Sequence, residues 1–291
     1  MASTIELSAG DYRLVLEPGR GGSIARFDWR GEPLMRPTCG PAILDAACFP
    51  LVPFSNRIAH GRFLAHGREI RLLPNLPDSD HPHPLHGFGW LAEWAVLAAS
   101  LSTATIAHLW PGGEWPWPYR AWQRFDLTAD GLTITLSLTN LGDSAMPAGL
   151  GFHPYFPRDP DTRYLGLHRG EWQTDDECLP LAFHRRDDAI DWWHDRPVSS
   201  RTVDTVYSGR CGPLLVSWPS RGLGLMIGPD EALGTTVVYA PKDADFFCVE
   251  PVSHIADAVN RGSEDTGLWW LAPGECRAVS LHLAVTTSIA T

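Results

Sequence analysis

The sequence lacks long apolar runs, paired cysteines and a basic start. Its 291 residues contain no run of about 18 apolar residues that could cross a bilayer as a helix. The six cysteines are scattered and form no CxxC pair, which excludes a zinc ribbon or a small disulfide scaffold and is typical of reduced thiols. The opening residues, MASTIELSAGDYRL, lack the basic and apolar parts of a secretory signal. We therefore expect a cytoplasmic protein without membrane contacts.

Positive charge is also scarce, with 23 lysines and arginines against 34 aspartates and glutamates, a net charge of −11. This balance argues against broad binding to nucleic acid or anionic membranes, whereas an uncharged sugar is compatible with it. The run GRGGS at 19–23 lacks the Lys-Ser/Thr ending of a phosphate-binding loop. We expect a small-molecule sugar as partner, no nucleotide, and a chain that acts as a monomer or homodimer.

Helical periodicity is nearly missing as well. Only 186–196 could form a turn or two, and LWWLA near the C-terminus is too short to assign. In LTITLSLTN, leucines and isoleucine alternate with hydroxyl residues, and Ala-Asp-Gly before it predicts a hairpin with WQRFDL. Further strands are predicted at 4–17, 23–31, 93–100, 103–110, 212–219, 222–229, 235–241, 245–251 and around 279–286. The sequence predicts one all-β domain over 1–291, an antiparallel sandwich of many strands.

Four segments carry residues suited to chemistry, and the first is FSNRIAHGRF. Its Asn56 and Arg57 could present an amide and a guanidinium to the oxygen atoms of a ligand. An isolated arginine more often pairs with a surface acid. This alternative stays open for Arg57.

The second segment, HPHPLHGFGW, holds three histidines. A metal site would need His81, His83 and His86 to converge on one ion. The intervening prolines favour an extended chain, in which His81 and His83 share a side and His86 points away unless the chain turns. We expect His86 to donate to a ligand that the following glycines let approach, and His81 and His83 to lie outside that site.

The third segment is GLGFHPYF. In an extended strand Phe152, Pro154 and Phe156 face one way, and His153 and Tyr155 face the other. A histidine held in this way beside a cleft could titrate near neutrality. A buried histidine with a structural hydrogen bond fits the pattern as well.

The fourth segment, FFCVEPVSHIADAVN, ends an apolar strand with a carboxylate. Alternation places Phe246, Cys248 and Glu250 on one face, and the strand is expected to stop at Pro251. If Glu250 faces an aromatic cleft, desolvation raises its pKa towards that of a useful general base.

Together these segments resemble the aldose 1-epimerase (galactose mutarotase) family. The resemblance rests on NRIAHGRF, HPLHGFGW, GFHPYF, VDTVYSG, FFCVEPVSHIADAVN and LAPGE, which follow one another over residues 54–275. It implies a large antiparallel β-supersandwich of the galactose mutarotase-like type. It also implies interconversion of the α and β anomers of a free aldose, with neither cofactor nor metal.

The resemblance assigns roles to five residues. It implies Glu250 as general base, His153 as general acid and His86 as an assisting ligand of substrate oxygen, with Arg57 and Asp204 holding sugar hydroxyls. We expect the carboxylate and the imidazolium to act from opposite sides of the sugar. Members with galactose activity carry Asn where this chain has Phe152, so the identity of the sugar stays open.

Three other functions remain as alternatives. An epimerase of an anionic hexose, phosphorylated or sulfonated, would need a cationic cluster, for which Arg20, Arg26 and Arg120 are candidates. A carbohydrate-binding protein on the same fold would need no acid–base pair. Metal-dependent hydrolysis through the three histidines is the most distant alternative.

Overall fold

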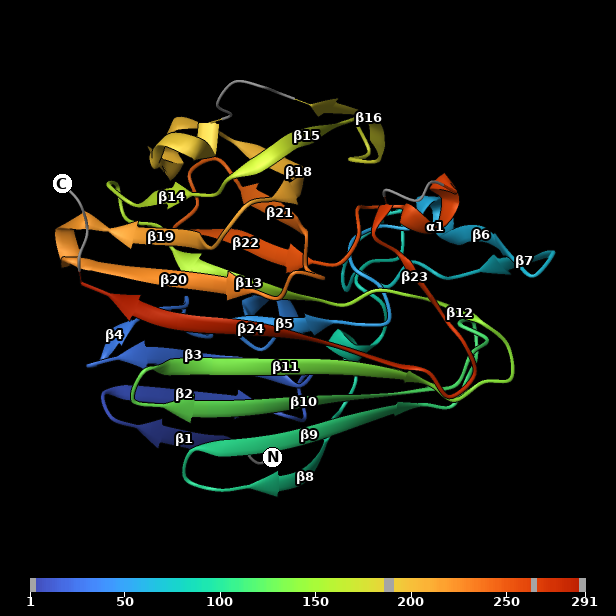
Figure 1. Ribbon diagram of the computed structural model, residues 1–291, viewed down its shortest axis with the longest axis horizontal. Coiled ribbons are helices and arrows are strands. Elements are labelled where there is room, and N and C mark those ends of the chain that lie inside the picture. The colour runs from blue at the N-terminus through green and yellow to red at the C-terminus, as the bar shows by residue number, and fades with distance from the viewer. Residues whose placement is uncertain (1–3, 186–190, 263–265, 288–291) are drawn as a thin grey trace.

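Two large antiparallel sheets lie face to face in the computed structural model, which describes residues 4–185, 191–262 and 266–287 (Figure 1). The first sheet contains, in spatial order, β1 (Ile5–Ala9), β2 (Tyr12–Glu17), β3 (Ser23–Trp29), β5 (Cys48–Leu51), β13 (Gly151–Pro157), β22 (Phe246–Val252), β21 (Thr235–Ala240), β18 (Val203–Arg210), β15 (His168–Thr174) and β16 (Pro180–Arg185), with β4 (Glu32–Pro33) attached to β3. The second contains β17 (Arg196–Pro197), β14 (Arg163–Leu165), β19 (Leu214–Trp218), β20 (Leu223–Pro229), β24 (Cys276–Thr286), β11 (Gly131–Asn140), β10 (Tyr119–Thr128), β9 (Thr103–Trp110) and β8 (Ala95–Ala99).

The remaining elements are short. Two small two-stranded sheets pair β6 (Arg62–Ala65) with β7 (Arg68–Arg71) and β12 (Met146–Ala148) with β23 (Trp269–Leu271). The α-helix α1 (Ala258–Arg261) is a single turn, and 3₁₀ turns cover Ile43–Asp45, Ala59–Gly61, Gly89–Leu91, Asp191–His194, Val198–Ser200 and Pro219–Arg221. Within the described ranges, no helix has the length and hydrophobicity needed to cross a bilayer. The predicted all-β antiparallel sandwich is confirmed.

The strand predictions hold in most places. The hairpin predicted around Ala-Asp-Gly is β10–β11, and the segment 4–17 is two strands that turn at Gly10. The segment LWWLA contains strand β23 rather than a helix. Of the segment 186–196, where a turn or two of helix was possible, the structure describes residues 191–196, which begin with the 3₁₀ turn Asp191–His194. The expected stop at Pro251 is wrong, because β22 continues to Val252.

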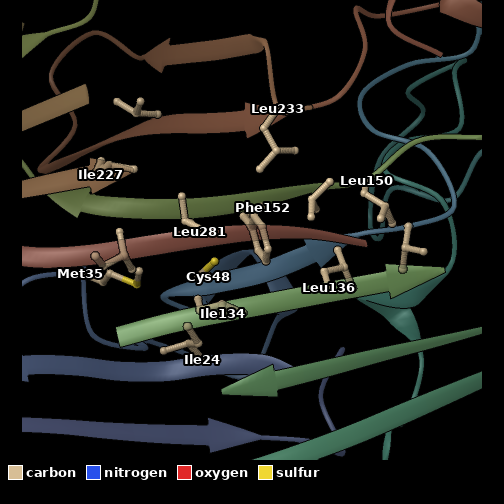
Figure 2. Close-up of a cluster of buried hydrophobic side chains, with 14 of the residues drawn as sticks. Ile24, Met35, Cys48, Ile134, Leu136, Leu150, Phe152, Ile227, Leu233 and Leu281 are labelled. Carbon is tan, nitrogen blue, oxygen red and sulfur yellow. The ribbon is translucent and has the colours of Figure 1, made fainter. Parts of the chain in front are cut away.

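The core between the sheets fixes which side of β13 faces outward. Figure 2 shows Phe152 of β13 among side chains of the second sheet, such as Ile134 and Leu281. These side chains are fully or almost fully buried, and burying each large apolar side chain stabilises the fold by about 1.5–3 kcal/mol. Because side chains alternate along a strand, His153 must then face away from the second sheet, as the sequence predicts.

Candidate active site

A pocket of about 210 Å³ lies on that outer face of the first sheet. This is below the ~300–1,000 Å³ of sites for drug-sized ligands, so the pocket suits a smaller molecule. Strands β13, β18, β21 and β22 supply its floor, and loops from the first third of the chain supply its walls. Its lining residues are Leu44, Asn56, Arg57, Leu76, Leu85, His86, His153, Tyr155, Asp204, Val237, Tyr239 and Glu250.

The lining contains all six site residues that the sequence and the resemblance singled out. It also contains apolar and tyrosine side chains that were not singled out. Alternation along β13 does place Tyr155 on the same side as His153, and Val237 and Tyr239 share one side of β21. No local signal marks Leu44 or Leu76, which reach the pocket through loop conformation.

His153 and Glu250 are neighbours on adjacent strands. The pairs Gly151↔Val252 and Tyr155↔Cys248 set the register in which residue 153 lies opposite residue 250. His153 Nε2 lies 3.3 Å from Glu250 Oε1, and both side chains are buried. The expectation that the two groups act from opposite sides of a sugar is therefore wrong, since this gap cannot hold a pyranose ring.

Two prolines explain the local form of these strands. Between Gly151↔Val252 and Tyr155↔Cys248 no ladder pair joins β13 to β22, although both strands are described throughout. Pro154 and Pro251 lie in this interval, and proline has no backbone N–H to donate. Because the strands form no ladder pair in this interval, no backbone N–H is needed from Pro154 or Pro251. Strand β22 can therefore continue past Pro251.

Burial favours the uncharged form of both groups. The pKa of Glu250 is raised well above its usual value, mainly by desolvation and further by nearby Asp204, while Arg57 opposes the shift. Desolvation lowers the pKa of His153 to about 3, and the charge of Arg36 acts in the same direction. With both groups uncharged, the pair carries one proton that can move between the Glu250 carboxyl and the His153 imidazole.

His86 reaches the pocket because the chain turns at that residue. His86 has a φ of 59° and Gly87 a φ of 71°, and a Cβ on Gly87 would lie 2.2 Å from the carbonyl oxygen of Val52. Only glycine fits that approach. His86 Nδ1 accepts the N–H of Asn56 at 3.1 Å, which leaves the proton on Nε2 as a fixed donor.

Arg57 is held on three sides. Its Nη2 donates to Asp204 Oδ2 at 3.2 Å, its Nη1 to Asn56 Oδ1 at 3.1 Å, and its Nε to His81 Nε2 at 3.4 Å. The acid that pairs with Arg57 therefore lines the pocket, so the alternative of an ordinary surface pair does not apply. His81 does not line the pocket, as expected, but its Nε2 accepts from the Arg57 side chain that does.

His83 stays outside the pocket, as expected. It is fully buried, and its Nδ1 accepts the N–H of His60 at 2.9 Å, so it anchors the turn at Ala59–Gly61. His81, His83 and His86 thus make three different sets of contacts instead of converging on one ion.

One group of possible metal ligands occurs among the described residues. Ligand atoms of His153, Cys248 and Glu250 lie within 4.8 Å of one another. Burial raises the pKa of the Cys248 thiol well above its usual value, which opposes the thiolate that a metal would need. Because this donor set contains a protonated thiol and the acid–base pair, it fits proton transfer better than metal binding.

The arginines proposed for an anionic sugar have other partners. Arg20 bonds to Gly40 and Thr38 and pairs with Glu17, and Arg26 pairs with Asp28. Arg120 lines a separate cavity on the outer face of the second sheet. None of the three lines the pocket.

Comparison with known proteins agrees with the geometry. The family model described as aldose 1-epimerase matches residues 3–284. YphB of Escherichia coli K12 is 35% identical over 289 residues, covering 96% of this chain and 97% of that protein. The crystal structure of a putative aldose 1-epimerase from E. coli K12 has a TM-score of 0.90 at 34% identity, covering 98% of this chain and 99% of that one. A galactose mutarotase-like protein from Clostridium acetobutylicum shares the fold with a TM-score of 0.86 at 17% identity, over 97% and 94% of the two chains. The chain belongs to the aldose 1-epimerase family.

Proposed function

We propose that this protein is an aldose 1-epimerase that interconverts the α and β anomers of a free aldose. The observation that carries the proposal is the close approach of a carboxyl and an imidazole, 3.3 Å apart, on the floor of a small desolvated pocket. A protein that only binds carbohydrate needs no such pair. The net charge of −11 and the pairing of Arg57 with Asp204 in the pocket favour a neutral sugar.

Ring opening moves one proton away from the sugar and one towards it. The anomeric hydroxyl O1 loses its proton, the C1–O5 bond breaks, and the ring oxygen O5 gains a proton. O1 and O5 are both bonded to C1, so two adjacent protein groups can reach them from one side. Glu250 as base takes the O1 proton, and His153 as acid supplies the proton for O5.

The charge balance of this step follows from burial. At rest both groups are uncharged, and moving the Glu250 proton to His153 Nε2 across the 3.3 Å gap gives the carboxylate and imidazolium that open the ring. After ring opening the pair is again a carboxylic acid and a neutral imidazole. This uncharged form is the one that desolvation favours for Glu250 and His153. Rotation about C1–C2 then exposes the other carbonyl face, and closure runs the same proton transfers backwards.

The other polar residues bind rather than transfer protons. His86 offers its Nε2 proton to a sugar oxygen, and Arg57 with Asp204 offers a donor and an acceptor for neighbouring hydroxyls. Asn56 orients both His86 and Arg57 through its backbone N–H and its Oδ1. The apolar lining leaves room for the C–H surface of the ring.

The test is anomer exchange measured by NMR or polarimetry on freshly dissolved α-anomers of several neutral aldoses. We expect acceleration above the spontaneous rate for at least one sugar, and a loss of about 10²–10⁴-fold in Glu250→Gln. Glu69→Gln removes an exposed carboxylate of β7 and is the matched control, with activity unchanged. Sugar binding without acceleration would instead indicate a carbohydrate-binding protein.

A further inference from the structure

The ring of His153 lies in a stack of aromatic side chains. Its centroid is 4.5 Å from that of Phe49, with 30° between the planes, and 4.8 Å from that of Tyr155, with 24° between them. We call Phe49, His153 and Tyr155 the ring stack. Because Nε2 must point at both Glu250 and a sugar oxygen, the plane in which this stack holds the imidazole sets the direction of proton transfer.

Arg36 holds the end of the ring stack. Its guanidinium carbon lies 4.1 Å from the centroid of the Tyr155 ring and 4.6 Å from that of Phe246, within the range of cation–π attraction. The backbone N–H of Arg36 also donates to the carbonyl of Tyr155 at 2.8 Å. Arg36 therefore contacts both the ring and the backbone of the residue stacked on His153.

The same guanidinium reaches a second wall of the pocket. Arg36 Nη2 donates to the carbonyl of Leu44 at 2.7 Å and to that of Ala46 at 3.1 Å. Leu44 and Tyr155 both line the pocket, one in the 3₁₀ turn Ile43–Asp45 and the other on β13. A planar group with several donors can hold a ring face and two carbonyls at once, whereas an ammonium cannot match both.

We propose that Arg36 is a positioning residue of the proton-transfer pair, which holds the plane of His153 through Tyr155 and ties the Ile43–Asp45 turn to that stack. The proposal rests on the proposed function. Arg36 does not line the pocket, so its action on a sugar is indirect. Its positive charge also acts on His153, as a cation that disfavours a second cation close by.

A pH profile separates this role from a merely structural one. The titratable and charged side chains around His153 are Glu250 and Cys248 on β22, Cys48 on β5, Tyr155 on its own strand, His86 on the adjacent loop, and Arg36. The pair is active with one proton and inactive when both groups are protonated. Because Arg36 lowers the pKa of His153, removing its charge should move the acid limb of the kcat profile to higher pH.

The experiment compares three variants with the wild type in kcat, KM, pH profile and melting temperature. Arg36→Met removes the charge and the planar group, and Arg36→Lys keeps only the charge. Arg30→Met is the matched control, because Arg30 also stacks on an aromatic ring, but that ring, Trp29, does not line the pocket as Tyr155 does. We expect Arg36→Met to lower kcat about 10- to 100-fold, with a smaller change in KM, and to shift the acid limb upward.

The remaining outcomes decide between the parts of the proposal. Arg36→Lys should keep the acid limb of the wild type while kcat falls, and Arg30→Met should change neither. Equal kcat and equal acid limbs in Arg36→Met and wild type would overturn the proposal, as would equal losses in Arg36→Met and Arg30→Met. NMR titration of the His153 ring in wild type and Arg36→Met needs no turnover. It would still report the influence of Arg36 if no sugar proved to be a substrate, so the two failures are distinguishable.

Discussion

The hairpin β10–β11 and the strand pair β13–β22 show two uses of the same antiparallel geometry. The hairpin forms ten consecutive pairs, from Tyr119↔Asn140 to Thr128↔Gly131. The pair β13–β22 forms four, and its interrupted interval contains His153 and Glu250. A continuous ladder satisfies the backbone and leaves the side chains to build the core, whereas the interrupted ladder lies where side chains face a ligand pocket.

The two regions also differ in how their outer faces are covered. On β11 the inward leucines are buried, and outward Thr133 and Thr135 remain partly exposed. On β13 every residue is buried, because loops from the first third of the chain cover the outer face. That cover removes water from His153, and desolvation is the main cause of its lowered pKa.

Substituting one member of a cross-strand pair in each region gives the largest expected difference. His153→Gln should lower kcat by about 10²–10⁴-fold, because the acid for O5 is lost. In the hairpin, Arg124 lies opposite Thr135 in the same antiparallel manner, and Thr135→Ser should leave kcat unchanged. Exchange NMR on the best sugar measures both. Comparable losses in the two variants would contradict the division between a structural ladder and a catalytic one.

The same contrast explains how much the sequence could predict. Alternation along β11 and β24 is regular, so the strands, the buried face and the hairpin turn are all readable. Alternation also correctly placed His153 on the side of β13 away from Phe152, and Glu250 on the same face of β22 as Cys248. The sequence could not predict that the two face each other, because their opposition depends on the register of strands about 100 residues apart.

Loop contacts were the hardest part to predict. The contact between His81 and Arg57 depends on how the 81–90 segment folds back, and the turn at His86 uses a left-handed backbone that non-glycine residues rarely adopt. The extended chain expected from the prolines placed His81 beside His83 correctly, but it could not predict the contact of His81 with Arg57. Neither Leu44 nor Arg36 lies in a recognisable motif, and both reach the site only through tertiary packing.

A loop substitution sharpens the comparison by separating binding from chemistry. Arg57 lies outside both ladders and bonds to Asp204, Asn56 and His81. Arg57→Met should raise KM about 10- to 100-fold, the value of a hydrogen bond to a charged group, and should lower kcat much less. Steady-state kinetics by exchange NMR gives both constants. A loss confined to kcat would mean that the loop takes part in proton transfer.

The contrast between the two regions extends from activity to stability, which should depend on pH. The pKa of Glu250 is raised, so above its ordinary value of 4.5 the unfolded chain ionises while the folded carboxyl stays protonated. Stability is then lost as pH rises, by up to about 1.4 kcal/mol per pH unit until the folded pKa is reached. Glu250→Gln removes this loss, so its melting temperature relative to wild type should increase from pH 5 to pH 8. Asp126→Asn on the regular hairpin, where Asp126 bonds to Arg124 near the surface, should show no such increase. A constant difference in melting temperature between Glu250→Gln and wild type across this range would mean that the carboxyl is not desolvated, and the contrast between the two ladders would lose its physical basis.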